Sequence, residues 1–441
     1  MAEIRPFHAL RYDPLRVAIQ DVVTQPYDKI TPEMQASYYA ASPYNLVRII
    51  LGKAEPGDNG QQNVYTRAAQ ALHEWQRSGI LKPDPKPSIY AYSQRFTISK
   101  GGSSHTLERR SFIALGRIYD YDQRIVFRHE QTLAKPKADR LDLLRATQAH
   151  FGQIFMLYSD PAASINGLLF SEGSYPDIEV SDEYGVAHRL RKVSDPHLLN
   201  IVTTEMADKK LVIADGHHRY ETALNYRNEA KAGDNPRLAA AAEFVMMTFV
   251  NMEEPGLVVL PTHRVLFGLA GLKAADLLQR IEAIAEVSRL EGADPAKALE
   301  RSSAQASEDS FFVLALKEGN YLLRIKAEQA ASLLSDLSAR QRRLDVLRLH
   351  RLVLNHALGI GEESIRQQIH IRYLRDAAEA VDSVHKDPKV NAAFLMNPVS
   401  IEQMRDVAFS GEVMPQKSTD FFPKLLSGLT IYSLNHESHL S

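Results

Sequence analysis

One junction constrains the fold of this chain more than any other. A short apolar strand, predicted over residues 211–214, ends at Asp215-Gly216, and a helix begins directly after it. Glycine permits a tight turn with a close backbone approach, and the first backbone N–H groups of a helix have no partners within it. The junction therefore predicts a buried strand whose end carries a polar binding site.

Predicted strands and helices alternate on both sides of this junction. We expect a helix over 139–150, strands over 152–158 and 243–250, and a helix from the turn to about residue 230. Such alternation is typical of mixed α/β folds.

The length predicts more than one compact unit. The chain has 441 residues, about three times the ~150-residue domain average. A hairpin and a strongly periodic helix change the pattern toward the C-terminus, and we place a boundary near residues 268–271. We expect a mixed α/β region over 1–125, a phosphate-binding core over 126–270 and a C-terminal α/β domain over 271–441.

Composition excludes several classes of function. The chain has no cysteine, which removes disulfides, thiolate chemistry and cysteine-based metal sites. Its 52 Lys and Arg residues against 54 Asp and Glu residues disfavour binding to nucleic acid. The longest apolar run, 244–250, is far below the ~18 residues of a membrane span, and the N-terminus lacks an apolar signal core. We expect a cytoplasmic protein with no nucleic-acid or membrane partner.

The residues after the glycine indicate the chemistry of the site. His217, His218 and Arg219 bring two imidazoles and a guanidinium to the positive end of the helix dipole. An anion, above all a phosphate, suits such a site. In the alternative interpretation Asp215 is only a helix cap, Arg219 is solvated and one histidine is buried.

The segment ADGHHRYETA, residues 214–223, resembles the signature of a bacterial and archaeal family known as domain of unknown function 1015. The resemblance extends over nearly the whole chain, through the segments QPYD (25–28), SPYN (42–45), HEQT (129–132), KPKADR (135–140) and PTHR (261–264).

The same junction is similar, more remotely, to the phosphate-binding box of the ParB, sulfiredoxin and free-serine-kinase superfamily. That resemblance implies a ParB/sulfiredoxin-like nucleotide-binding core, with ATP or ADP and Mg²⁺ held at Asp215-Gly216. Sulfiredoxins carry a catalytic Cys where this chain has His217, and ParB proteins add a basic DNA-binding element that is not evident here. The kinases have the D-G-H-H-R form of the box, which matches best.

A carboxylate followed by cations is a second candidate for phosphoryl-transfer chemistry. Glu130 could accept the proton of a substrate hydroxyl or hold Mg²⁺, while Lys135, Lys137 and Arg140 neutralise phosphate charge. In the alternative interpretation this stretch is a capped helix start with a solvated basic face.

His263 and Arg264 follow a short predicted strand, and open α/β sheets bind ligands at strand ends. We expect both to contact the nucleotide, although an exposed polar loop would have the same pattern.

The remaining candidates concern a small substrate. Tyr27, Tyr44 and Asn45 follow rigid proline turns and could recognise its polar ends, together with His129 and Thr132. Proline-tyrosine turns also commonly fill a core, with the hydroxyl hydrogen-bonded. Asp28 is the second candidate, besides Glu130, for the catalytic base, and His217 is a third catalytic candidate as a donor to the phosphates.

These features favour a nucleotide-dependent phosphotransferase that acts on the hydroxyl of a small metabolite, with free L-serine as the specific expectation. One alternative is a metal-dependent hydrolase or phosphatase that uses His129, His217 or His218, His263 and Asp215 as ligands. Another is a non-catalytic, ParB-like nucleotide-binding switch. The expected partners are a nucleotide and a small molecule; the sequence leaves the oligomeric state open, with a homodimer as one option.

Overall fold

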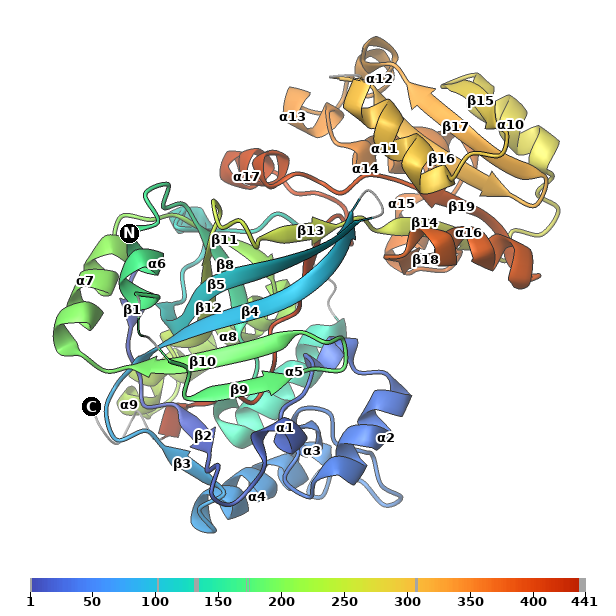
Figure 1. The fold of residues 1–441 in the computed structure, drawn as a ribbon. Helices are drawn as coiled ribbons and strands as arrows, with labels where there is room; N and C mark the ends of the chain where they lie inside the picture. The colour runs from blue at the N-terminus through green and yellow to red at the C-terminus, as the bar shows by residue number, and fades with distance from the viewer. Residues whose placement is uncertain are drawn as a thin grey trace. The chain divides into compact units, whose positions relative to one another are not determined.

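The computed structural model describes residues 2–100, 103–130, 135–171, 173, 175–305 and 308–435 (Figure 1). The chain forms two compact units. The first unit comprises the described residues of three stretches, 1–128, 132–258 and 423–441. The second unit comprises Val259–Phe422 together with His129 and Glu130. Both units combine helices with sheets, which confirms the predicted mixed α/β class. Among the described residues, no helix is both long and apolar enough to cross a membrane.

The first unit is built on a nine-stranded mixed sheet in the order β6-β11-β8-β12-β5-β4-β10-β9, with β1 also paired to β5. β11 runs parallel to β6 and antiparallel to β8, and β12 is parallel to β8. The strands are β1 (Ile4–Arg5), β4 (Ile89–Lys100), β5 (Ser103–Arg117), β6 (Val126–Phe127), β8 (Ile154–Tyr158), β9 (Ile178–Ser181), β10 (Ala187–Val193), β11 (Leu211–Asp215) and β12 (Phe244–Asn251).

Helices and two short strand pairs complete this unit. The pairs are β2 (Leu10–Tyr12) with β3 (Leu81–Pro83) and β7 (Ala149–His150) with β21 (Tyr432–Ser433). The helices are α1 (Ile19–Val22), η1 (Tyr27–Lys29), α2 (Pro32–Ala41), α3 (Val47–Ile50), α4 (Val64–Arg77), η2 (Tyr121–Gln123), α5 (Lys135–Thr147), α6 (Ser164–Leu169), α7 (Pro196–Met206), α8 (His217–Ala232) and α9 (Pro236–Ala241).

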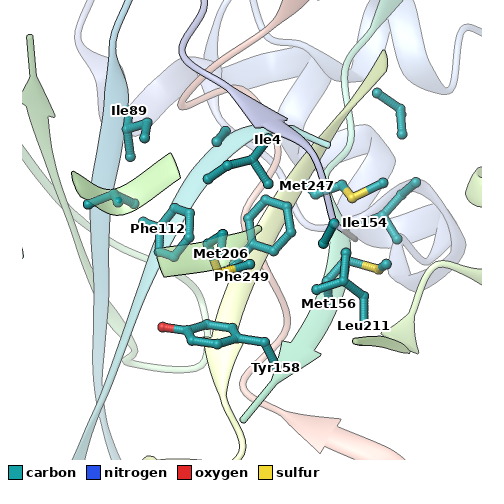
Figure 2. Packing of buried hydrophobic residues seen from close by; sticks show 14 of the residues in the cluster. Ile4, Ile89, Phe112, Ile154, Met156, Tyr158, Met206, Leu211, Met247 and Phe249 are labelled. Carbon is teal, nitrogen blue, oxygen red and sulfur yellow. The ribbon is translucent and has the colours of Figure 1, made fainter. Parts of the chain in front are cut away.

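Alternate residues of the central strands build the core of the first unit (Figure 2). Ile154, Met156 and Tyr158 share one face of β8, because successive side chains of a strand point to opposite faces. They pack with Met247 and Phe249 from β12. All five residues of β8 are buried, as are the first four of β11, so the polar end of β11 follows a fully apolar stretch.

The last described residues of the chain return to the first unit. Leu10 and Ile431 exchange two backbone hydrogen bonds, and Thr24 and Ser427 do the same. The fully buried Arg109 donates to the carbonyl oxygen of Pro423 at 2.6 Å. This division differs from the predicted C-terminal domain over 271–441, because an apolar stretch such as 425–434 carries no local signal of the core that it joins.

The second unit has a six-stranded sheet in the order β15-β17-β16-β19-β14-β18 and a short pair, β13 with β20. Its strands are β13 (Val258–Leu260), β14 (His263–Phe267), β15 (Glu286–Leu290), β16 (Ser310–Leu316), β17 (Gly319–Ile325), β18 (Ile371–Leu374), β19 (Val390–Leu395) and β20 (Asp420–Phe422). Its helices are α10 (Ala274–Glu282), α11 (Pro295–Gln305), α12 (Ala327–Leu333), α13 (Ala339–Arg342), α14 (Asp345–Arg348), η3 (Leu349–Ala357), α15 (Glu362–Arg366), α16 (Ala377–Lys386) and α17 (Ile401–Ser410). The periodic helix predicted over 344–358 is α14 followed by a π-helix, η3.

Gly256 provides a test of the packing in the first unit. A Cβ atom there would lie 2.1 Å from the carbonyl oxygen of Glu108 and 2.6 Å from the backbone nitrogen of Arg109. We expect Gly256→Ala to lower the free energy of unfolding by about 1–3 kcal/mol or more, because backbone atoms would have to move. Gly167→Ala is the control, since a Cβ in the middle of α6 meets nothing within 4 Å. It should be neutral or stabilise by up to ~1 kcal/mol. Urea unfolding measures both, and equal effects would contradict the close approach at Gly256.

Candidate functional site

The predicted strand-turn-helix junction is present in the first unit. β11 ends at Asp215, and Gly216 has a φ of 90° and serves as the N-cap of α8, a helix of 16 residues. The left-handed backbone at this position favours glycine, and a Cβ there would lie 3.1 Å from Cζ of Arg219. No side chain caps the helix. The first N–H groups of an α-helix have no acceptor within the helix itself.

Asp215 stands between two cations rather than capping the helix. Its Oδ2 lies 3.6 Å from Nη2 of Arg219 and 3.5 Å from Nζ of Lys424, a residue from the returning C-terminal segment. Desolvation would raise the pKa of the Asp215 carboxyl, but the charges of Lys424, then Arg219, Lys29 and His217, hold the pKa well below its usual range. Asp215 is therefore a carboxylate at neutral pH.

Arg219 is the central cation of the junction. Its Nη1 donates to the carbonyl oxygen of Gln153, and its side chain is only 14% exposed, so it is not the solvated residue of the alternative interpretation. His217 is 8% exposed, which agrees with that interpretation's single buried histidine. Glu221, one helical turn on, is buried with Oε1 3.8 Å from Nη1 of Arg128.

A cavity of about 70 Å³ adjoins Arg219 between α5, α8 and the segment around β7. Its polar lining comprises Tyr27, Arg140, His150, Arg219, Thr222 and Ser427. The apolar lining includes Ile50, Leu143, Leu144, Phe151 and Val245. Three residues predicted to contact substrate or cofactor, Tyr27, Arg140 and Arg219, therefore share one cavity.

Tyr27 and Arg140 are in contact where they line this cavity. Cζ of Arg140 lies 4.2 Å from the centre of the Tyr27 ring, and its Nη1 donates to the carbonyl oxygen of Ile50 at 2.7 Å. Nε of Arg140 donates to Asp139 at 2.7 Å. Burial raises the pKa of the Tyr27 phenol, against the opposing charges of Arg219 and Arg140. The phenol is a neutral hydrogen-bonding group beside two guanidinium groups.

His150 and Thr222 also line the cavity. The His150 ring stacks on Tyr432 at 5.9 Å between centroids, and burial lowers its pKa to about 4, so the imidazole is neutral at pH 7. Thr222 is 4% exposed, and its Oγ1 has no hydrogen-bond partner among the described residues. A hydroxyl in a helix commonly bonds to the carbonyl four residues earlier, so this unpaired group is unusual.

Tyr44 and Asn45, predicted to contact substrate, have the contacts of a structural turn. The Tyr44 ring packs against Trp75 at 6.0 Å, and Asn45 is 1% exposed. The Asn45 amide donates to the carbonyl oxygen of Asp21 and accepts from the backbone of Val47. Asp28, by contrast, lies in η1 directly beside Tyr27, with its side chain 38% exposed and its Oδ2 3.9 Å from Nζ of Lys29.

Other predicted residues belong to the second unit. Oε1 of Glu130 accepts hydrogen bonds from the backbone nitrogens of Ser418 and Thr419, at 2.8 and 3.2 Å. His129 is fully buried, with its Nε2 2.8 Å from Oγ1 of Thr419. Both residues therefore hold the 415–419 loop of that unit. Thr132 and the side chains of Lys135 and Lys137 lie outside the described residues.

His263 and Arg264 also lie in the second unit, as the first residues of β14 rather than in a loop. Both are buried. Nδ1 of His263 accepts from the backbone of Met396, and burial lowers its pKa to about 4. Nη2 of Arg264 donates to the carbonyl oxygen of Lys417 at 3.2 Å. The alternative of an exposed polar loop is therefore wrong. Nucleotide contact by either residue stays a prediction.

The sequence analysis did not identify two residues of this site, Lys424 beside Asp215 and Thr222 in the cavity. Lys424 is the single cation of an apolar stretch, FFPKLL, 209 residues from Asp215, and no local pattern connects the two. Thr222 could have been found, because it lies three residues after Arg219 on the same helix, where side chains share a face. Within the described residues, no group of three or more His, Asp or Glu side chains could hold a metal ion.

The buried state of His263 predicts how stability depends on pH. Its pKa of about 4 in the folded chain lies below the ordinary 6.5, so below pH 6.5 the unfolded chain binds a proton that the folded chain does not. Stability is then lost as pH falls from 6.5 toward 4, by about 2 kcal/mol between pH 7 and pH 5 from this residue alone. Urea unfolding at the two pH values should show a smaller loss for His263→Gln. An unchanged loss would mean that His263 is not buried in its neutral form.

No curated protein matches this sequence, but several solved structures resemble it weakly. A conserved hypothetical protein from Pyrococcus furiosus is 13% identical at a TM-score of 0.35, over 71% of this chain and 93% of that one. A free serine kinase in complex with AMP is 13% identical at 0.35, over 67% and 83%. SbnI from Staphylococcus aureus, solved with a C-terminal truncation, is 10% identical at 0.36, over 73% and 88%. At such values the likeness carries no information about what this chain binds.

A family model gives the stronger result. The model described as protein of unknown function DUF1015 matches residues 4–347, well over half of the chain and including the whole β11-turn-α8 junction. The chain therefore belongs to the DUF1015 family.

Proposed function

We propose that the first unit binds a nucleotide through its phosphates and transfers a phosphoryl group to the hydroxyl of a small metabolite. The observation that carries this proposal is the start of α8: a long helix that follows a glycine turn, has no capping side chain, and is flanked by Arg219 and Lys424. Oriented N–H groups, the helix dipole and nearby cations together favour a phosphate.

The phosphates would lie against the Gly216 turn. The backbone N–H groups of His217, His218 and Arg219 would supply directed donors, and the Arg219 guanidinium, which lies against Gly216, would contact the same phosphate. Arg219 and Lys424 would neutralise the charge, with His217 as a further donor. Phosphoryl transfer needs such positioning and charge stabilisation more than it needs a covalent nucleophile.

Asp28 is the catalytic base of this proposal. It belongs to the same unit as the turn and neighbours Tyr27, which lines the cavity beside Arg219. The acceptor oxygen attacks the terminal phosphorus, the bond from that phosphorus to the bridging oxygen breaks, and the hydroxyl proton passes to the Asp28 carboxylate. Glu130, the other base predicted from sequence, already accepts two backbone hydrogen bonds.

ATP or ADP is the proposed donor, and L-serine is the first acceptor to test. Mg²⁺ would enter with the nucleotide. Magnesium usually keeps several waters and takes one or two carboxylates beside the phosphates, so the lack of a three-residue cluster among the described side chains is compatible with it. Asp215 would be its protein ligand.

Nucleotide affinity tests the phosphate site. Arg219→Ala and Lys424→Ala should each weaken ADP binding about 10- to 100-fold, the usual cost of a lost charge-assisted hydrogen bond. Arg77→Ala is the control, because Arg77 is exposed on α4 and pairs only with Glu74 among the described residues. Isothermal titration calorimetry measures all three. Tight ADP binding that is insensitive to both site variants would refute the phosphate site.

Turnover tests the proposed chemistry. Asp28→Asn should lower kcat by about 10²- to 10⁴-fold, the typical contribution of a general base, with nucleotide affinity nearly unchanged. Phosphorylated product from ATP or ADP with L-serine and related hydroxy acids can be followed by ³¹P NMR. A protein that binds nucleotide tightly but forms no product with any acceptor would be a switch rather than a phosphotransferase.

A further inference from the structure

The cavity beside Arg219 has apolar lining residues and a buried hydroxyl without a hydrogen-bond partner among the described residues, and a phosphate site alone explains neither. Arg219 lines it and also reaches Asp215 at the turn, so a molecule in the cavity would lie next to a phosphate bound at the start of α8. Thr222, three residues along α8, faces the same cavity from ~4.5 Å further along the helix axis. An acceptor bound in the cavity would therefore have its hydroxyl close to the terminal phosphate, as phosphoryl transfer requires.

The lining of the cavity is divided between charge and apolar surface. Arg140 and Arg219, with the neutral Tyr27 phenol, supply its cationic lining, while Leu143, Leu144 and Val245 supply apolar lining, which we call the apolar wall. The Arg140 guanidinium is fixed by Asp139 and by the Ile50 carbonyl. A guanidinium has five N–H donors, so Arg140 keeps donors for a ligand. L-Serine, which has no aliphatic group beyond its hydroxyl carbon, would leave the apolar wall without a partner.

The hydroxyl of Thr222 is the second, independent sign of a ligand. It is more than nine-tenths buried, and its Oγ1 makes no hydrogen bond within the described part of the chain. An unsatisfied buried hydroxyl costs stability, and a valine of the same shape would avoid that cost. A ligand with a polar group at this depth removes the penalty when it binds.

We propose that this cavity binds the acceptor substrate, and that the acceptor is a small hydroxy acid carrying at least one aliphatic carbon more than L-serine. The proposal rests on the function proposed above. Arg140, with Tyr27, holds the carboxylate, Thr222 bonds to the amino or second polar group, and the aliphatic carbon packs on Leu143, Leu144 and Val245. The hydroxyl that accepts the phosphoryl group points toward Arg219 and transfers its proton to Asp28.

The choice of acceptor tests the apolar wall and the cationic lining separately. With the full-length protein, L-threonine should bind about fourfold more tightly than L-serine, because it buries one more methyl group. L-Threoninol, in which the carboxylate is reduced to an alcohol, should bind at least tenfold more weakly than L-threonine. Calorimetry without nucleotide measures the three affinities. Equal affinity for L-serine and L-threonine, or for L-threonine and L-threoninol, would overturn the assignment.

Thr222→Val distinguishes a contact between the Thr222 hydroxyl and the ligand from a purely structural role of that hydroxyl. We expect the midpoint of thermal unfolding to stay or rise, because an unpaired buried hydroxyl is removed, while L-threonine affinity falls about tenfold. Thr203→Val is the matched control: Oγ1 of Thr203 on α7 already donates to the carbonyl oxygen of Leu199 at 3.0 Å. It should lower the midpoint and leave L-threonine affinity unchanged. Loss of stability without loss of affinity in Thr222→Val would contradict the proposal.

Arg140→Gln tests the carboxylate contact directly. It should bind L-threonine and L-threoninol with similar affinity, because the guanidinium that distinguishes a carboxylate from an alcohol is lost. Arg145→Gln, an exposed change on the same helix, should keep the preference for L-threonine.

ADP titrations separate this proposal from the function on which it rests. ADP binding with no binding of any of the three acceptors overturns only the cavity assignment. Acceptor binding with no ADP binding overturns the phosphotransferase and leaves the cavity as a hydroxy-acid site.

Discussion

The site of the first unit depends on the contacts that the Asp215 carboxylate makes with two cations. It ends a strand whose other residues are buried and meets Arg219 from α8 and Lys424 from the far end of the chain. A single carboxylate between cations leaves a local excess of positive charge, which is stable only near water or a bound anion. The cluster thus holds three segments together, and we propose that it also prepares a place for a phosphate.

The returning segment makes this arrangement possible. Residues 423–434 are fixed to the first unit by backbone pairs at Thr24 and Leu10 and by the buried Arg109. Lys424 is therefore positioned by rigid backbone on both sides, although the DUF1015 match ends at residue 347. Its role illustrates why a site built by long-range contacts is only partly visible in any local motif.

Sequence reasoning located the parts of the site that depend on local geometry. The glycine turn, the start of α8 and the cations at Arg219 and Arg140 follow from residue types at fixed spacing, and the structure has them in one unit. It did not locate Lys424, because this residue lies 209 residues from Asp215 along the chain. It placed His263 and Arg264 just beyond the end of a short strand, whereas they begin a second, buried strand whose pairing with β18 and β19 is not encoded locally. Tyr44 and Tyr27 share a local pattern, yet one packs in a core and the other lines a cavity.

Amide protection around the turn tests the central claim most directly. Hydrogen exchange of the backbone amides, measured by NMR with and without ADP, reports on the N–H groups that the phosphate is proposed to bind. The account predicts that exchange of the amides of His217, His218 and Arg219 slows on nucleotide binding, with a smaller effect around Lys424. Saturating ADP that leaves these amides unchanged while protecting others would contradict it.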